Sequence, residues 1–382
     1  MLVSIHKKYK ELFGDEPLLV RSPGRVNIIG EHTDYNEGFV LPAAIDKAIY
    51  VAVGKRTDEE IHLYAVDFTE SYSVSITDLL PTKTWVTYIL GVADQLIKRG
   101  HNIGGFNLVI DGDVPLGAGL SSSAAVECAT VFALNELFAL GIDKMEMVKI
   151  AQTAEQVYAG VMCGIMDQFA SMFGKKDQLI KLDCRSLEYE YKPLVLEGYK
   201  LVLFNTNVKH SLASTEYNTR RQQCEQGVAW IMQHQPEVHS LRDASLQMLT
   251  DYVLPQDGLI YKRCKYVVEE IQRLQSACAF LEKGVIVSVG KKMFETHDGL
   301  SKDYEVSCPE LDYLVDAVKN NPAVLGARMM GGGFGGCTIN IIREDAVDEI
   351  SGQLGPAYQA AMQLQLSAHI VSIGEGTSVQ NL

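Results

Sequence analysis

Four stretches of the chain gather side chains that could act chemically on a small polar molecule. The first, residues 22–42, holds ionisable groups between turn-forming glycines, and they are Arg25, Glu31, His32, Asp34 and Tyr35. Carboxylates accept the hydrogen bonds that sugar hydroxyls donate, in a strong charge-assisted form. The residue types therefore favour a sugar-binding site here over a solvated polar turn with a capping aspartate.

The second stretch, residues 114–129, places glycines ahead of three consecutive serines and an Ala- and Leu-rich run. Gly117 and Gly119 would let backbone amides approach a ligand, and the helix expected from Leu120 or Ser121 would point its unpaired N–H groups the same way. Such an arrangement suits phosphate. One serine hydroxyl could also coordinate Mg²⁺, a hard cation that prefers oxygen. An ordinary glycine turn with a serine N-cap is the alternative.

The third stretch, residues 329–342, is rich in glycine and matches Gly-x-Gly-x-x-Gly through Gly331, Gly333 and Gly336. A strand rather than a helix is expected to follow, so the dinucleotide-binding interpretation fails on context. We interpret the stretch as a close-approach loop that lines a phosphate-bearing cleft, with a tight inter-strand turn as the alternative. The sequence has no Walker motif and neither His-Arg-Asp nor Asp-Phe-Gly, which excludes a Walker-type kinase and a protein kinase.

The fourth stretch, residues 154–174, holds two carboxylates beside apolar residues. Asp167 follows Gly164 and two apolar side chains and precedes an apolar, helix-like run. It is therefore either a helix N-cap or a partly buried functional group. Glu155 lies on the preceding helix, beside its apolar stripe.

The elements that would position these groups mix strands and helices. Strands are predicted at residues 18–21, 49–54, 61–66, 72–76, 106–110, 201–205, 337–342 and 369–373. Helices are predicted over 120–140, from an N-cap at Asp143 to Gly160, through the middle of the chain after residue 205, and over 345–363. Without the strict alternation of a doubly wound sheet, this order favours an α+β class. A boundary near Lys192 would give domains of residues 1–192 and 193–382.

Length, charge and cysteines limit the class of protein. A chain of 382 residues suggests two domains, and its net charge of −14, from 34 basic and 48 acidic residues, argues against nucleic acid as a partner. The eight cysteines are scattered without a Cys-x-x-Cys pair, and no apolar run is long enough to span a membrane. We therefore expect a reduced, cytoplasmic protein without a membrane partner.

In these stretches the chain resembles the galactokinases of the GHMP small-molecule kinase superfamily. The resemblance extends from about Leu19 to Cys337, is most specific at Gly-Glu-His-Thr-Asp-Tyr (residues 30–35), and includes residues 208–224. It implies an ATP-dependent enzyme of galactose catabolism that phosphorylates the anomeric C1 hydroxyl of galactose. It also implies two domains with the active site between them, one like the second domain of ribosomal protein S5 and one ferredoxin-like.

The resemblance also implies a role for each site residue. Asp167 would accept the proton of the attacking hydroxyl, and Arg25 would orient Asp167 and steady the developing charge. The sugar would contact Glu31, His32, Thr33, Asp34, Gly164, Asp167 and Tyr217. The ATP phosphates would lie against Gly117, Ala118, Gly119, Leu120, Ser121, Ser122 and Ser123. Mg²⁺ would be held by Ser123 and Glu155.

Two alternatives stay open at this point. The chain could phosphorylate a related sugar, N-acetylgalactosamine or arabinose, although Thr33 looks like the galactose enzymes. It could instead be a non-catalytic sensor of galactose and ATP, but the intact Ser121–Ser123 run and Asp167 favour turnover. The expected partners are galactose and MgATP, bound by a monomer.

Overall fold

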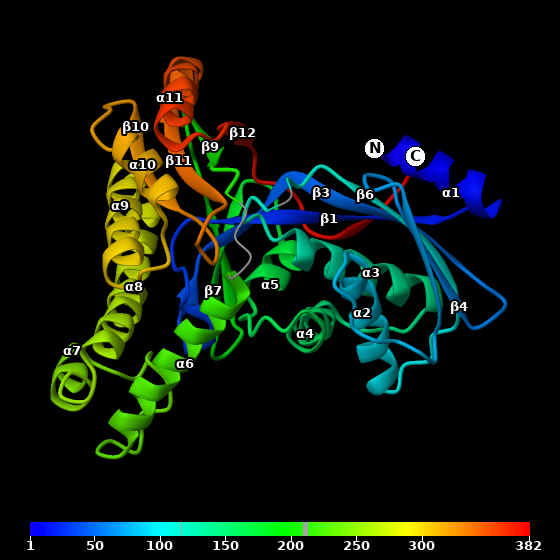
Figure 1. Ribbon diagram of the computed structural model, residues 1–382, viewed down its shortest axis with the longest axis horizontal. Coiled ribbons are helices and arrows are strands. Elements are labelled where there is room, and N and C mark those ends of the chain that lie inside the picture. The colour runs from blue at the N-terminus through cyan, green and yellow to red at the C-terminus, as the bar shows by residue number, and fades with distance from the viewer. Residues whose placement is uncertain (116, 209–212) are drawn as a thin grey trace.

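A computed structural model describes residues 1–115, 117–208 and 213–382 of the chain (Figure 1). Leu116 and residues 209–212 lie outside the described residues, and so does that part of the 208–224 stretch. The larger sheet has six strands in the order β13-β1-β3-β6-β4-β5, of which only the β4–β6 pair is parallel. Its strands are β1 (Leu18–Asn27), β3 (Pro42–Lys55), β4 (Glu60–Ala65), β5 (Glu70–Ser75), β6 (Phe106–Gly112) and β13 (Ser378–Gln380).

Helices cover both faces of this sheet (Figure 1). The helix α1 (Leu2–Phe13) packs on β3 and β6 through Ile5 and Tyr9. On the opposite face lie α2 (Val86–Lys98), α3 (Ser122–Phe138), α4 (Lys144–Ala154) and α5 (Met166–Phe173). Almost the whole first half of α3 is buried, as expected of a helix that is apolar on all sides. The N-terminus of this central helix is thereby fixed rigidly beneath β1 and β3.

A second sheet carries the glycine-rich stretch. It has four strands in the order β10-β11-β9-β12, all antiparallel. They are β9 (Tyr199–Asn205), β10 (Val324–Met329), β11 (Cys337–Arg343) and β12 (Ser367–Val371). The helices α6 (Ala213–Met232), α7 (Leu246–Met248), α8 (Gly258–Glu282), α9 (Ile286–Lys302), α10 (Pro309–Val318) and α11 (Val347–Met362) belong to this part of the chain. A small third sheet joins β2 (Phe39–Val40), β7 (Gln178–Asp183) and β8 (Tyr189–Pro193).

Most of the predicted elements are confirmed, with shifted ends. The helix expected from Leu120 or Ser121 begins at Ser122, and it ends at Phe138 because Ala139 turns to the left-handed conformation ahead of Gly141. Asp143 caps the next helix, since its side chain accepts from the backbone N–H of Glu146 at 3.0 Å. That helix widens into a π turn over Glu155–Ala159 and stops at Gly160, as predicted.

The two sheets share one hydrophobic core. The largest buried cluster includes Val51 and Leu108 of the first sheet together with Leu203 and Ile339 of the second. The strand β13 also returns from the end of the chain to pair with β1. The boundary at residue 192 therefore stays a prediction, and the two parts are joined more tightly than by a linker. Among the described residues, no helix combines the length and the apolar character that crossing a bilayer requires.

Candidate active site

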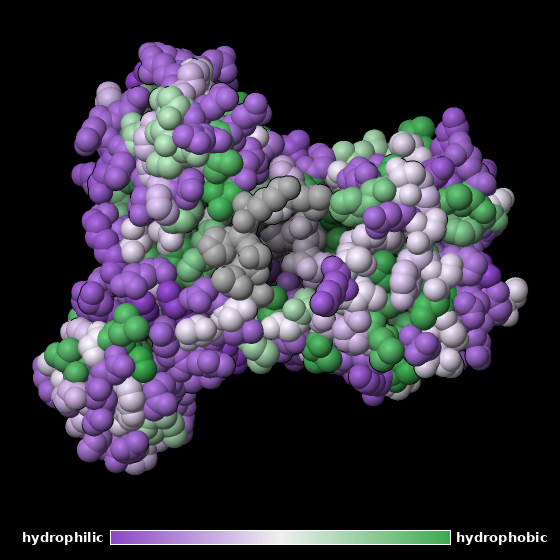
Figure 2. All heavy atoms as spheres, viewed as in Figure 1, coloured by the Kyte–Doolittle hydropathy of each residue, from purple (hydrophilic) through white to green (hydrophobic). Residues whose placement is uncertain are grey.

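The predicted stretches meet around one cavity of about 320 Å³. It opens in the region where the surface is hollowed between the two sides of the molecule (Figure 2). Its walls include Arg25, Glu31, His32, Asp34, Gly117, Ala118, Gly119, Leu120, Ser121, Ser122, Ser123, Glu155, Cys163, Gly164, Asp167, Tyr217 and Gly331–Gly333. Of the predicted site residues, only Thr33 does not line it. Thr33 is fully buried, and its hydroxyl donates to the carbonyls of Gly30 and Phe39, so its predicted sugar contact has no geometric support.

Arg25 and Asp167 form a two-point ion pair on the wall of this cavity. Arg25 Nε lies 2.8 Å from Asp167 Oδ1 and Arg25 Nη2 lies 3.0 Å from Asp167 Oδ2. Ser121 Oγ donates to Asp167 Oδ2 at 2.5 Å, and Arg25 Nη1 donates to the carbonyl of Gly119 at 2.6 Å. Asp167 is the second residue of α5, whose N-cap position is Ile165, so the capping alternative is wrong. The fork geometry fixes the carboxylate while leaving its edge in the cavity.

Asp34 stands opposite this pair on a short 3₁₀ turn, Asp34–Asn36. It accepts from the backbone N–H of Tyr35 at 3.0 Å. Burial, together with the like charge of Asp167, raises the pKa of Asp34 to about 7. Gly164 is required here, because a Cβ at that position would stand 2.0 Å from Asp34 Oδ2. Asp34 and Asp167 therefore face one space, and Asp34 is the carboxyl whose pKa is raised.

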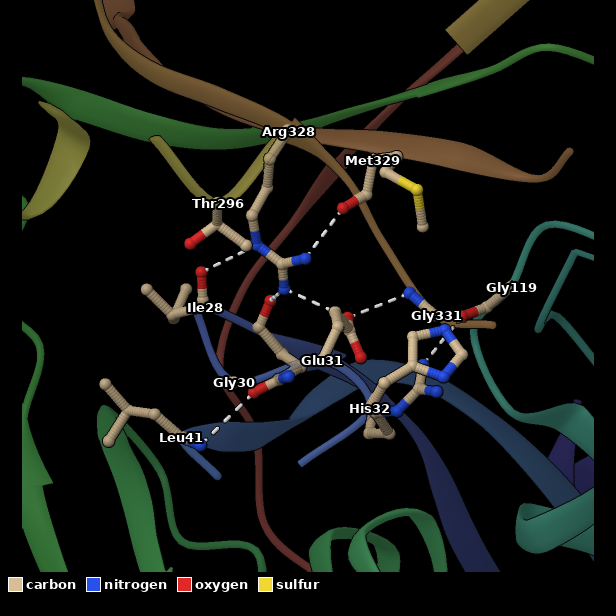
Figure 3. A network of polar contacts seen from close by, with 12 residues as sticks. Ile28, Gly30, Glu31, His32, Leu41, Gly119, Thr296, Arg328, Met329 and Gly331 are labelled. Atoms are coloured by element: carbon tan, nitrogen blue, oxygen red, sulfur yellow. Dashed lines mark hydrogen bonds and ion pairs between the residues drawn. The ribbon is translucent and has the colours of Figure 1, made fainter. Parts of the chain in front are cut away.

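Glu31 is held by two donors from the second sheet. Its Oε1 accepts from Arg328 Nη2 at 3.0 Å and from the backbone N–H of Gly331 at 2.8 Å (Figure 3). Burial by itself would raise the pKa of Glu31, but the positive charges of Arg328 and Arg25 outweigh it and lower the pKa. Sequence reasoning missed Arg328. The available signal was one guanidinium inside an otherwise apolar strand, β10.

His32 uses both ring nitrogens within the protein. Nε2 lies 3.3 Å from the carbonyl of Gly332, and Nδ1 lies 2.8 Å from the hydroxyl of Tyr35. Burial lowers the pKa of His32 to about 4, so the ring is neutral. A carbonyl only accepts, so Nε2 carries the proton and Nδ1 accepts from Tyr35, whose oxygen in turn accepts from Tyr304 at 2.7 Å. His32 therefore offers the cavity mainly its ring, which lies 5.2 Å from that of Tyr217.

The serine-rich loop forms the opposite wall. Gly117 and Gly119 have positive φ angles of 70° and 72°, and Ser121 also has a positive φ of 55°. The hydroxyl of Ser121 donates to Asp167 rather than capping α3. The loop lies close to the glycine-rich loop of the second sheet, since a Cβ at Gly331 would stand 3.3 Å from the carbonyl of Gly119. The two glycine-rich stretches thus pack against each other beside the cavity, near the N-terminus of α3.

Two oxygen donors at the end of this loop could hold a divalent cation. Ser123 Oγ lies 2.8 Å from Glu155 Oε1, and Gln168 Nε2 steadies the other carboxylate oxygen at 2.6 Å. Burial, and then the charge of Asp167, raises the pKa of Glu155. Among the described residues, no three His, Cys, Asp or Glu side chains gather as a metal-binding group. The donor set fits Mg²⁺, which usually takes one or two carboxylates and completes its shell with water and phosphate.

A second, apolar cavity of about 110 Å³ adjoins Ser122 and Ser123. Trp85 and Tyr88, the latter on α2, line it together with Phe68. Sequence reasoning did not find this cavity. The signal was the spacing of Trp85 and Tyr88, three apart at the start of a helix, which places both rings on one face.

Comparisons with known proteins agree with this arrangement. Residues 7–55 match the family described as galactokinase galactose-binding signature, residues 87–175 the GHMP kinases N terminal domain and residues 277–360 the GHMP kinases C terminal. The chain is 40% identical to the galactokinase of Thermotoga maritima, over 94% of this chain and 98% of that protein. It is 41% identical to the galactokinase of Clostridium acetobutylicum, over 94% of each.

Solved structures give the same picture. The crystal structure of Lactococcus lactis galactokinase complexed with galactose superposes with a TM-score of 0.95 at 34% identity, covering 99% of this chain and 100% of that one. Mevalonate kinase of Methanococcus jannaschii superposes with a TM-score of 0.62 at 17% identity, covering 94% and 98%. The second likeness concerns the fold alone. Together they confirm the α+β, two-domain GHMP kinase architecture expected from the sequence.

Proposed function

Because the chain belongs to the galactokinases of the GHMP kinase superfamily and transfers phosphate from ATP to galactose, we propose that its reaction centre is the Arg25–Asp167 pair. In this proposal galactose lies between Asp34, Glu31 and Tyr217, with its C1 hydroxyl at Asp167. The observation that carries the proposal is the two-point ion pair, with Ser121 on the same carboxylate, on the wall that the sugar and phosphate loops share.

Asp167 acts as the acceptor of the hydroxyl proton. Phosphoryl transfer passes through a loose transition state, so positioning and charge neutralisation supply most of the rate. A carboxylate is a weak base toward a sugar hydroxyl, and the proton therefore moves late, after the bond to phosphorus has begun to form. Arg25 keeps Asp167 in one orientation through the fork, and its charge steadies the negative charge that develops nearby.

The nucleotide lies along the serine-rich loop. The phosphates face Gly117–Ser123, where a helix N-terminus and left-handed glycines present backbone N–H groups. The apolar cavity beside Ser122 and Ser123 accepts the base, with Trp85 and Tyr88 as the aromatic surfaces. The short distance from this cavity to the main one, which share both serines, supports a single extended nucleotide site.

Ser123 and Glu155 would hold Mg²⁺ next to the phosphates. A bound magnesium ion supplies neutralisation of phosphate charge. The protein's own part is to keep two oxygens 2.8 Å apart at the end of the loop and to shield Glu155, which is 8% exposed, from bulk water. Gln168 holds the carboxylate in that position.

Family membership makes the chain an enzyme and sets aside the non-catalytic sensor. The match to the galactose-binding signature and to the galactokinase relatives favours galactose over N-acetylgalactosamine and arabinose. The eight free thiols suit the cytoplasmic location that we predict. A monomeric state stays a prediction.

The test is a steady-state ADP-release assay with MgATP and galactose, N-acetylgalactosamine, arabinose and glucose. We expect galactose to give the highest kcat/KM, and phosphorus NMR of the product to show phosphate on C1. Asp167→Asn serves as the control for sugar-independent ATP hydrolysis. Absence of galactose-dependent ADP release would overturn the proposed function, and a product phosphorylated elsewhere than C1 would overturn the placement of the hydroxyl at Asp167.

A further inference from the structure

Arg328 is the most deeply buried charge beside the cavity, yet it does not line it. Arg328 is 0% exposed, and it lies on β10, three positions before Gly331, the first glycine of the glycine-rich loop. Its side chain points away from its own sheet toward the end of β1 (Figure 3). A buried guanidinium is costly unless nearly all its N–H groups find acceptors. Where those donors go therefore shows what the residue holds together.

Four hydrogen bonds leave the guanidinium of Arg328. Nε donates to the carbonyl of Ile28 at 2.8 Å and Nη1 to the carbonyl of Met329 at 2.7 Å, while Nη2 donates to the carbonyl of Asn27 and to Glu31 Oε1. Asn27 is the last residue of β1, the strand that also carries Arg25, and Ile28 follows it directly. The residue therefore ties the glycine-rich loop of one sheet to the strand end and sugar loop of the other.

Glu31 receives its orientation from this connection. Arg328 and the backbone N–H of Gly331 both occupy Oε1. Glu31 nevertheless lines the cavity, and both of these bonds go to the same carboxylate oxygen (Figure 3). A carboxylate held in this way accepts a hydroxyl hydrogen bond without first having to lose rotamer freedom. Tyr266 adds a further restraint by donating to the carbonyl of Glu31 at 3.1 Å.

We propose that Arg328 is a positioning residue for sugar binding, which acts through Glu31 and the Gly331 loop and never touches the sugar. The inference rests on the proposed function, because it takes the sugar to lie against Glu31. It predicts a particular kinetic pattern. Loss of Arg328 weakens the affinity for galactose, while the phosphate loop and the Arg25–Asp167 pair, which receive no hydrogen bond from Arg328, keep their geometry.

The competing explanation is that Arg328 has only a structural role and links the two sheets. A purely structural link would lower thermal stability and the apparent kcat, because less folded enzyme would be present, but it would leave the KM for galactose and the KM for ATP unchanged. Positioning through Glu31 instead separates the KM for galactose from kcat and from the KM for ATP. It also makes sugar binding depend on whether Glu31 is ionised.

The chain offers a matched control in Arg263. This arginine on α8 is also buried, at 2% exposure, and it donates to the carbonyl of Asp303 and to Glu305 Oε2 at 2.7 Å. It does not line the cavity. Arg263→Met and Arg328→Met therefore remove the same group from similar surroundings, and only the second touches a sugar-loop carboxylate.

The first experiment compares these two variants with the unaltered enzyme at saturating MgATP, with thermal melting in parallel. We expect Arg328→Met to raise the KM for galactose by about 10- to 100-fold, which corresponds to the loss of one charge-assisted hydrogen bond. The KM for ATP and kcat, corrected for folded fraction, change less than threefold. Arg328→Lys keeps the charge but cannot span the strand end and Glu31 together, and it carries the same expectation at about 3- to 10-fold.

The second experiment measures kcat/KM for galactose between pH 5 and pH 8.5. Glu31 is faced by Arg25, Arg328, His32, Asp34 and Tyr266. Without Arg328 the pKa of Glu31 rises, so its carboxylate protonates on acidification, and the ratio of variant to unaltered enzyme falls as the pH falls. Asp34 titrates in both proteins and cancels in this ratio. Adding Glu31→Gln to Arg328→Met removes the extra pH dependence.

The outcomes divide cleanly. An unaltered enzyme that is inactive on galactose overturns the proposed function itself. An active enzyme in which the Arg328 variants match Arg263→Met, with an unchanged KM for galactose and no added pH dependence, overturns only the positioning role. Should Arg328→Met fail to fold, Arg328→Lys, which leaves no unpaired buried carboxylate, gives the same decision.

Discussion

Two arginine–carboxylate pairs flank the same cavity and differ in exposure. The side chain of Asp167 is 26% exposed beside an Arg25 at 4%, whereas Glu31 and Arg328 are 2% and 0% exposed. Asp167 is exposed enough to contact a reacting group. Glu31 is almost fully buried, so it can contact a ligand with only a small part of its carboxylate. The same two functional groups are therefore suited to different tasks, with burial as the deciding variable.

The N–H groups of the two arginines also contact different kinds of acceptor. Arg25 gives two contacts to Asp167 and one to the carbonyl of Gly119. Arg328 gives one to Glu31 and three to backbone carbonyls. One is mainly a clamp on a carboxylate, and the other is mainly a clamp on the backbone. Variants of the first pair should therefore change kcat, and variants of the second pair should change the KM for the sugar.

The largest effect is expected from Asp167→Asn. The amide keeps the shape of the side chain but cannot accept the hydroxyl proton, so kcat should fall by about 10²- to 10⁴-fold. Galactose binding, measured by calorimetry, and the melting temperature should stay close to those of the unaltered enzyme. A fall in kcat of less than about fivefold would show that Asp167 does not accept the proton. The contrast between the Arg25–Asp167 and Arg328–Glu31 pairs would then not hold.

Arg25→Lys is the mirror image of the Arg328 variants. Lysine keeps the charge but cannot form the fork with Asp167, so kcat should fall by about 10- to 100-fold, the value of one charge-assisted hydrogen bond. The KM for galactose should change less than threefold. A rise in that KM as large as the fall in kcat would mean that the Arg25–Asp167 pair also determines sugar binding, so that the two pairs do not have separate roles.

Glu155 provides a carboxylate without a guanidinium clamp. Its hydrogen bonds come from Ser123, Gln168 and Cys163. If it holds the metal, Glu155→Gln should raise the Mg²⁺ concentration for half-maximal activity by about tenfold. Ser123→Ala should give a smaller change in the same direction. Direct Mn²⁺ binding, followed by electron paramagnetic resonance, checks the site apart from turnover, and unchanged titrations in both variants would refute the pair as ligands.

The smallest effect concerns stability at Asp34. Its pKa is about 7 in the folded chain, above the ordinary value of 3.8, because of burial and the charge of Asp167. The folded state then holds a proton that the unfolded state has lost, so this carboxyl lowers stability progressively as pH rises from about 4 to about 7. At pH 8, Asp34→Asn should raise the melting temperature by about 2–4 °C, with little change at pH 4. An equal rise at both pH values would argue against this cause.

The sequence predicted the local features of the site better than its long-range contacts. The sugar loop, the serine run and Asp167 were found because each is a dense cluster of unusual residues within a short stretch. The helix at Asp143 was predictable because capping acts over three residues. Arg328 and Tyr304 were missed, since their partners Glu31 and Tyr35 lie about three hundred positions away in the chain.

Two details could not be read from residue types at all. Thr33 and His32 stand in the most specific motif, yet one hydroxyl and both ring nitrogens are taken by the protein itself. Which side of a loop residue faces a ligand depends on backbone angles, and His32 has a positive φ of 62° that turns its side chain toward Gly332 and Tyr35.

The return of β13 to the edge of the first sheet has a consequence for biosynthesis. Ser22 on β1 and Thr377 beside β13 share a hydrogen bond of 2.8 Å although they are 355 positions apart. The strand that bears Arg25 must therefore wait, with one edge unpaired, until nearly all of the chain has left the ribosome. A nascent chain that already contains every cavity-lining residue still lacks this strand, so the edge of β1 at Leu19–Arg21 stays unpaired until residues 378–380 have been made.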